Sequence, residues 1–116
     1  MPHNFQNLEI WKRGCILAEE TYKAFLNSND YEFRSQMVRA SLSIPSNIAE
    51  GSERGSDKDF IRFLRYAKGS SGELYTQAII AHKLNLISEE SASFLKQESL
   101  EVSSMIVALT QRLSKV

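Results

Sequence analysis

The sequence predicts an all-α fold: an antiparallel up-down-up-down four-helix bundle that forms a single domain over residues 1–116. Apolar residues recur at steps of three and four in four long segments, which is the spacing of one helix face. The chain holds only two Pro and five Gly, fewer than an all-β protein with many turns usually needs. The connections between the segments are short, and short connections favour antiparallel neighbours.

The first predicted helix covers about residues 5–26. Its apolar stripe consists of Leu8, Trp11, Cys15, Ala18, Tyr22 and Phe25. Turn-forming residues at positions 27–30 end the helix. Because Cys15 lies in this stripe, we expect a buried and unreactive thiol. It is the only cysteine, so it has no internal disulfide partner, and this favours a reducing compartment.

The second predicted helix covers about residues 32–50 and carries the stripe Phe33, Met37, Ala40, Ile44 and Ile48. Pro45 lies inside this stripe and the periodicity continues across it, which predicts one helix kinked at Pro45. A proline within a helix costs about 3 kcal/mol, because it removes an amide donor and clashes with the preceding turn. Gly51 suits a left-handed C-cap, and Gly55 is a second glycine in the same turn.

The third predicted helix begins after Ser56, which caps it, and ends near Asn85. Its apolar stripe consists of Phe60, Leu64, Ala67, Ser71, Leu74, Ala78 and Ala81. Small residues occupy positions 69–72, and each glycine there costs about 1 kcal/mol relative to alanine. We therefore expect another backbone to approach this helix closely at its middle.

The fourth predicted helix begins at Ser88. Its stripe consists of Leu95, Ser99, Val102, Ile106, Leu109, Leu113 and Val116. Glu89 and Glu90 in the first turn, and Arg112 and Lys115 near the end, complement the helix dipole. No strand-like alternation, repeat or linker competes with this assignment, so we expect no domain boundary.

The sequence offers no catalytic, metal-binding or cofactor-binding motif. A di-iron bundle needs Glu-x-x-His pairs on two helices, whereas the only histidines are His3 and His82, and residue 79 is Ile. His82 stands near a helix end, where it complements the dipole or faces solvent. Glycine-rich phosphate-binding motifs are absent as well, so we expect neither a cofactor nor a metal.

Two carboxylates are candidates for a site between the second and third helices. Glu50 ends the kinked helix, and Glu73 follows the small residues of the third. A buried carboxylate needs a cationic or hydrogen-bond-donating partner, and Arg39, Asn47 and Arg54 are available. One interpretation is a polar clamp between helices; the other is acid–base catalysis.

Basic residues gather around the start of the third helix, although the formal net charge of the chain is zero. This basic ridge consists of Arg54, Lys58, Arg62, Arg65 and Lys68. It is continuous if Arg54 lies close to the helix, and Asp57 and Asp59 screen it in part. One interpretation is a solvated helix face. The other is contact with nucleic-acid phosphates, which gives a salt-sensitive affinity without sequence preference.

The N-terminus carries no signal-peptide pattern, and no apolar run is long enough to span a membrane. Together with the single cysteine, this predicts a cytoplasmic protein without a membrane partner. The zero net charge gives no general argument for binding to nucleic acid or to a membrane.

Two stretches of the sequence carry a family resemblance. The first is residues 43–51, Ser-Ile-Pro-Ser-Asn-Ile-Ala-Glu-Gly; the second is the set Phe60, Phe63, Leu64, Ala67, Gly69-Ser70 and Glu73-Leu74. The set Phe5, Leu8, Trp11 and Tyr22 fits as well. From Phe5 to about Leu86, the chain resembles the bacterial four-helix bundle family that includes proteins encoded by 23S ribosomal RNA intervening sequences.

The resemblance implies an antiparallel four-helix bundle, a homopentamer and no known enzymatic activity. A related branch, the accessory variability protein of diversity-generating retroelements, is strongly basic and binds nucleic acid and a reverse transcriptase; this chain departs from it in having no net charge. The family's motif positions are occupied by Asn47, Glu50, Gly51, Gly69, Ser70 and Glu73. We expect these residues to join the second helix to the third and to shape a surface used in assembly.

Three hypotheses about function follow. The first is a non-enzymatic bundle that assembles into a ring and binds RNA or DNA weakly through the basic ridge. The second is a protein–protein interaction adaptor without a nucleic-acid role. The third is an enzyme, which a deep polar pocket enclosing Glu50 and Glu73 would favour and a packed, dry contact between them would disfavour.

Overall fold

The computed structural model describes residues 4–115 and confirms a bundle of four helices. A short 3₁₀ turn at Phe5–Asn7 precedes the helices, which are α1 (Glu9–Ala24), α2 (Tyr31–Glu53), α3 (Asp57–Lys83) and α4 (Glu89–Ser114). The first predicted helix is therefore divided, because Leu8 between the turn and α1 has an extended backbone. His3 and Val116 lie outside the described residues.

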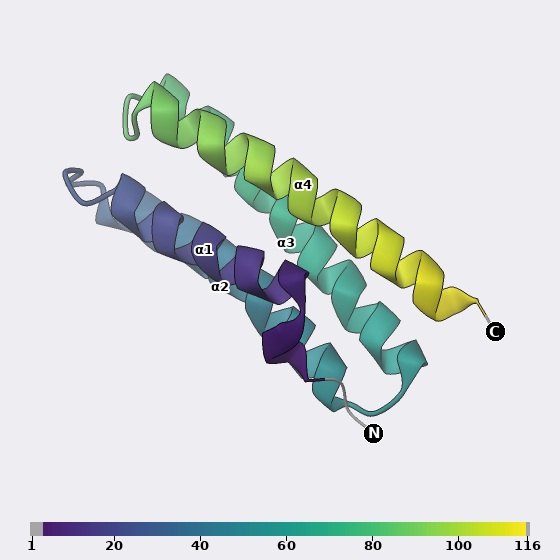
Figure 1. Ribbon diagram of the computed structural model, residues 1–116. Helices are drawn as coiled ribbons and strands as arrows, with labels where there is room; N and C mark the ends of the chain where they lie inside the picture. Colours follow the sequence, from purple (N-terminus) through teal and green to yellow (C-terminus); the bar gives the residue numbers. More distant parts are fainter. Residues whose placement is uncertain (1–3, 116) are drawn as a thin grey trace.

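The four helices form a long, narrow bundle with principal extents of 47 × 19 × 19 Å. Figure 1 shows that the chain reverses direction at each of the three loops, so that the first and last helical turns lie at the same end. α2 packs on α1 and α3, and α4 packs on α3 and α1, so each helix has two neighbours. None of the helices among residues 4–115 is long and apolar enough to cross a membrane.

Three of the four helices begin at a side-chain cap. Asp30 accepts a hydrogen bond from the Phe33 amide, and Ser56 accepts one from the Asp59 amide. At the start of α4, the Ser88 hydroxyl accepts one from the amide of Ser91. Each cap satisfies an amide that has no partner within the helix, which is worth about 1 kcal/mol.

The apolar stripes of α2, α3 and α4 face the core as their spacing predicts. In α3, all seven predicted stripe residues are buried. In α2, Phe33 is only partly buried, and in α4 the stripe loosens near the end, where Leu109 and Leu113 are half-buried. The last turns of a helix, at the end of the bundle, have fewer neighbouring side chains to cover them.

The predicted core face of α1 is wrong by about one residue. The buried residues are Ile10, Gly14, Leu17, Ala18 and Thr21, together with Phe25 at the C-cap. Tyr22 of the predicted stripe is exposed, and Trp11 and Cys15 are half-buried. The reason is Gly14: a Cβ there would lie 3.3 Å from the Pro45 Cδ atom, so α1 turns its smallest residue toward the proline ring.

α2 is one continuous helix with Pro45 inside it, as predicted. Its end was predicted wrongly, because α2 continues through Gly51 to Glu53 and the left-handed residue is Gly55, with φ of 86°. Gly51 is instead buried inside the helix. The kink at Pro45 stays a prediction.

The end of α3 forms a Schellman cap around Asn85, which has φ of 61°. The amide of Asn85 donates to the His82 carbonyl, and the amide of Leu86 donates to the Ala81 carbonyl. These two bonds satisfy carbonyls that the helix leaves free. Asn85 therefore ends the helix as the sequence predicts.

A buried group of serines lies between α3 and α4. The Ser71 hydroxyl donates to the Ser99 carbonyl at 2.6 Å, and the Ser103 hydroxyl lies 2.9 Å from that of Ser71. Polar groups buried between helices are stabilising only when they are paired. These hydrogen bonds therefore fix how α3 and α4 align along their length.

Arg13 joins α1 to α4 through an ion pair with Glu98 and a longer one, at 3.9 Å, with Glu101. The guanidinium of Arg13 donates to both carboxylate oxygens of Glu98, at 2.7 and 2.8 Å, and also to the sulfur of Met105 at 3.2 Å. Both charged side chains are mostly buried, with 27% and 17% of their surfaces exposed. The hydrogen bond to Glu98 raises the pKa of Arg13 above its ordinary value.

Candidate functional site

The structure places Arg54 close to α3, which is the condition for a continuous basic ridge. The guanidinium of Arg54, at the end of α2, lies 4.8 Å from the centre of the Phe63 ring on α3. The guanidinium of Arg62 lies 4.9 Å from the same ring. Tyr66 packs edge-on against Phe63 at 5.4 Å and is itself exposed. Two cations and two aromatic rings therefore form one cluster.

The two arginines of this cluster are not free charges. Arg54 pairs with Glu50 at 2.9 Å, and Arg62 pairs with Asp59 at 3.2 Å. Both pairs are exposed and join residues on the same stretch of helix, so each is worth well under about 1 kcal/mol. They nevertheless cancel the local positive charge that a phosphate would meet.

The other three ridge residues carry the uncompensated charge. Lys58, Arg65 and Lys68 are exposed, and within residues 4–115 none of them forms an ion pair. Arg65 and Lys68 line a groove of about 490 Å³ between α3 and α4. Gly69 of α3 lines the same groove, and α4 contributes Ile106, Val107, Thr110 and Gln111. No carboxylate is among these lining residues.

The motif residue Gly51 lies very close to α3. A Cβ built at Gly51 would lie 2.7 Å from the Phe63 Cβ and 3.3 Å from the Phe60 Cα. Real Cβ atoms essentially never come within 3.0 Å of another heavy atom. A larger residue at position 51 would therefore force α2 and α3 to shift, so packing between the two helices favours glycine here.

Further along the same interface, Ser43 and Ser70 are joined by a hydrogen bond of 2.5 Å. The Ser43 hydroxyl also lies 2.7 Å from the Ala40 carbonyl, and the Ser70 hydroxyl lies 3.2 Å from that of Tyr66; each hydroxyl has one proton to share among these contacts. The Asn47 side chain donates to the Ser43 carbonyl at 2.8 Å, so it acts within α2 rather than between helices. Of the motif residues, Gly51 and Ser70 thus make the contacts between α2 and α3.

The close approach expected at residues 69–72 is absent at both glycines. A Cβ at Gly69 or at Gly72 would meet no heavy atom within 4 Å, and both residues are exposed. Within this stretch, the contact with another helix is made by Ser70 and Ser71. The two glycines therefore lower helix stability without any packing reason inside the described chain.

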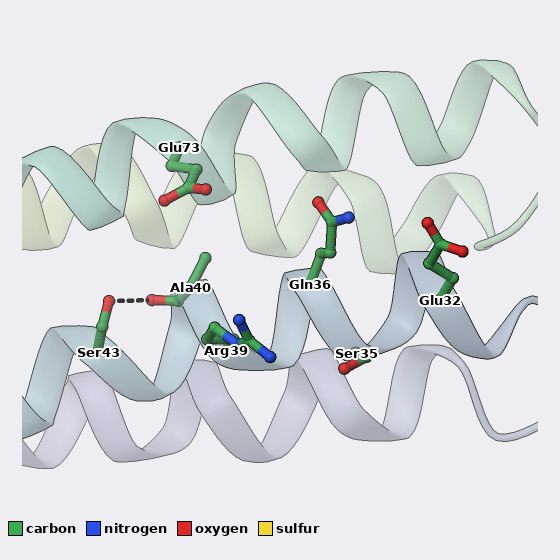
Figure 2. Close-up of a pocket in the computed structure, with 7 residues that line it drawn as sticks. All are labelled: Glu32, Ser35, Gln36, Arg39, Ala40, Ser43 and Glu73. Atoms are coloured by element: carbon green, nitrogen blue, oxygen red, sulfur yellow. Dashed lines mark hydrogen bonds between the residues drawn. The ribbon is translucent and has the colours of Figure 1, made fainter.

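Glu73 lines an open polar groove of about 580 Å³ between α2 and α3. Figure 2 shows Glu73 on α3 and, on α2, Gln36 pointing toward α3. Arg39 lines the groove, but within residues 4–115 it forms no ion pair with Glu73. Glu50 does not line this groove. Of the candidate partners for these carboxylates, Arg54 pairs with Glu50, and this pair lies at the end of α2.

Two other kinds of reactive group are a possible metal-binding cluster and the thiol of Cys15. Among the described residues, no group of three or more His, Cys, Asp or Glu side chains could hold a metal ion. Cys15 is half-buried, and burial raises the pKa of its thiol, with a further contribution from Glu19. A raised pKa keeps the thiol protonated and slows its reactions.

Sequence reasoning missed the residues that surround the ridge. Phe63 and Tyr66 lie three residues apart on α3, and this spacing places them on one helix face. The sequence of α3 gives no indication of which α4 residues lie beside it. Val107, Thr110 and Gln111 line the groove but lie outside the apolar stripe of α4, so the spacing of apolar residues does not identify them.

The bundle is similar to that of a known protein. One solved structure, a protein of unknown function from the S23 ribosomal protein family of Bacteroides thetaiotaomicron, has a TM-score of 0.80 and 21% sequence identity. The similarity covers 87% of this chain and 97% of that one. No curated protein matches the sequence.

The family comparison covers nearly all of the bundle. The model of the 23S rRNA-intervening sequence protein family matches residues 6–108, from the 3₁₀ turn to the last third of α4. The matched part contains Pro45, Gly51 and every residue of the basic ridge. On this match, the chain belongs to the 23S rRNA-intervening sequence protein family.

Proposed function

We propose that this protein is a non-enzymatic, self-assembling helical bundle of the cytoplasm that binds RNA or DNA weakly through its basic ridge. The observation that carries the nucleic-acid part is the uncompensated charge of Lys58, Arg65 and Lys68, all exposed on one helix. Each phosphate that such a side chain neutralises releases counterions, which provides affinity without sequence preference.

Three cations on one subunit give only weak binding. Repetition of the same ridge around a ring would raise the overall affinity, because later contacts form at high effective concentration. A homopentamer is the assembly that the family resemblance implies. Exposed apolar side chains, among them Leu42 on α2 and Leu100 on α4, are available for contacts between subunits.

Light scattering at low and high salt, with and without a 30-nucleotide RNA, tests assembly and binding together. We expect a mass of several subunits and an RNA complex that dissociates as salt rises. The triple variant with Lys58→Gln, Arg65→Gln and Lys68→Gln should lose the complex and keep the protein mass. A monomer at every concentration would refute assembly, and no complex at low salt would refute binding.

A protein–protein adaptor is the second candidate function. The observation that favours it is an exposed apolar surface where α1 meets α2: Tyr22, Tyr31, Val38 and Leu42 line a groove of about 520 Å³. The Arg34 guanidinium covers the Tyr22 ring there, 4.3 Å from its centre. If the ridge binds no nucleic acid at low salt while changes to Tyr31 and Leu42 abolish a partner interaction, this function replaces the first.

A further inference from the structure

We propose that the groove between α3 and α4 binds an unpaired nucleotide of a single-stranded nucleic acid. Its phosphate lies against Arg65 and Lys68, and its base lies over Ile106 and Val107. The inference rests on the proposed nucleic-acid function and makes it specific: it names the part of the ridge that binds and the form of nucleic acid that it accepts.

The chemistry of the groove is complementary to a nucleotide. One wall carries two cations and no carboxylate, so the groove favours an anion. The floor and the opposite wall are apolar at Ile106, which is buried, and at Val107, which is partly exposed. Thr110 and Gln111 add a hydroxyl and an amide, which have both donors and acceptors for the edge of a base.

The groove is large enough for one nucleotide that has left its stack. About 490 Å³ lies within the range of small-molecule sites, which is roughly 300–1,000 Å³. A duplex keeps its bases stacked inside and offers its phosphates and groove edges, so its bases cannot reach the apolar floor. A single strand can turn a base outward, and proteins that recognise RNA sequences commonly use such unstacked bases.

Gly69 explains how the groove stays open. It lines the groove, and a Cβ there would meet nothing within 4 Å of the protein's own atoms. A larger side chain at this position would occupy the space between Arg65 and α4. The glycine costs helix stability that packing does not demand, and access to the groove is what it provides.

The α2–α3 groove and the aromatic cluster fit an anion less well. The α2–α3 groove is lined by Glu32 and Glu73 as well as Arg39, so its acids oppose a phosphate. At the aromatic cluster, Arg54 and Arg62 are already paired with Glu50 and Asp59. The α3–α4 groove is the place where the ridge keeps its charge and meets an apolar surface.

The test compares a fluorescent 20-nucleotide oligo(U) with an RNA hairpin duplex of the same length, by anisotropy, at 50 and 200 mM salt. Three variants of the full chain are measured. The double change Arg65→Gln with Lys68→Gln removes the cations, Gly69→Leu fills the groove, and the double change Lys12→Gln with Arg39→Gln removes two exposed charges elsewhere. Thermal unfolding of each variant reports its folding. Leucine is a good helix former, so Gly69→Leu should unfold no earlier than the native chain.

We expect the single strand to bind at least tenfold more tightly than the duplex. Arg65→Gln with Lys68→Gln should weaken it about tenfold and lower the salt slope by about 0.7, since the two cations contact one phosphate and each single-strand phosphate contributes about 0.7. Gly69→Leu should abolish the preference for the single strand, whereas the control charges should leave it unchanged.

Two results would overturn the inference in different ways. Equal binding of single strand and duplex, unaffected by Gly69→Leu but lost with the cations, would refute the nucleotide site and leave the proposed nucleic-acid function standing. No binding of either RNA at 50 mM salt would refute both. Competition by polyglutamate that matches oligo(U) at equal charge would also overturn the inference, because it would show a groove for acidic polymers in general.

Discussion

A comparison of Gly51 with Gly69 allows a sharp test of the packing between α2 and α3. Gly69 lies in the middle of α3 and Gly51 in the last turn of α2, so alanine gains helix propensity at both positions. Their surroundings differ completely. A Cβ at Gly51 would lie 2.7 Å from the Phe63 Cβ, whereas a Cβ at Gly69 would meet nothing within 4 Å. Replacing each glycine by alanine therefore separates propensity from packing.

The expected magnitudes follow from two opposing effects. Glycine to alanine in a helix interior stabilises by up to about 1 kcal/mol. At Gly69 nothing opposes this gain, and for a domain of this size it corresponds to a rise in Tm of roughly 4 °C. At Gly51 the added methyl overpacks a contact with Phe60 and Phe63, which costs about 1–3 kcal/mol. The net effect of Gly51→Ala is therefore a loss of about 0–2 kcal/mol.

Urea unfolding followed by circular dichroism measures both variants against the native chain, and Gly72→Ala serves as a second open-site control. The free energy of unfolding should rise for Gly69→Ala and Gly72→Ala and should be unchanged or fall for Gly51→Ala. If Gly51→Ala stabilised the protein as much as Gly69→Ala does, the close approach of α2 to α3 at Gly51 would be refuted.

Three further predictions concern other parts of the bundle. A double-mutant cycle with Arg13→Met and Glu98→Gln should give a coupling of about 1–3 kcal/mol in urea unfolding, because the hydrogen bonds join charged, mostly buried groups; a value near zero would contradict a clamp between α1 and α4. Ser71→Ala should lower the free energy of unfolding by about 1 kcal/mol, since it removes the hydrogen bond to the Ser99 carbonyl, while the exposed Ser104→Ala should have no effect. The pKa of Cys15 is raised in the folded protein, so the folded state holds the thiol proton more tightly; this stability is present below about pH 8.5, the ordinary thiol pKa, and is lost as pH rises above it. Cys15→Ala should remove that decline in an unfolding series from pH 7 to 10, and an identical decline in both proteins would contradict the assignment.

The core of the bundle was predictable where apolar residues alone define the buried face. The stripe of α3 contains only Phe, Leu, Ala and one Ser, and every member is buried. In α1 the buried face includes Gly14 and Thr21, which an apolar pattern does not count. The pattern therefore selected a neighbouring face, and only the position of Pro45 on α2 explains why Gly14 lies inside.

The candidate site was predictable in composition and not in arrangement. The spacing of the basic ridge correctly joined Arg54 to α3, because the loop between α2 and α3 is short. Which of the cations remain without an acidic partner depends on the carboxylates that each side-chain rotamer reaches, and the sequence does not contain that information. The groove beside Arg65 and Lys68 needs α4 as its second wall, and helix order alone does not say which face of α4 lies there.

The contact between α1 and α4 has a consequence for how the bundle opens. It is the smallest of the four interfaces between the helices of the described residues, and its ion pair between Arg13 and Glu98 joins residues 85 positions apart, so it closes a very long loop. The α2–α3 and α3–α4 interfaces are the two largest, whereas α1 contacts α2 and α4 over the two smaller ones. Native-state hydrogen exchange should therefore reveal a sub-global opening in which the amides of α1 exchange before those of α3. Helices α2, α3 and α4 then form one cooperative unfolding unit. Helix α1 separates from this unit first, when the ion pair between Arg13 and Glu98 breaks.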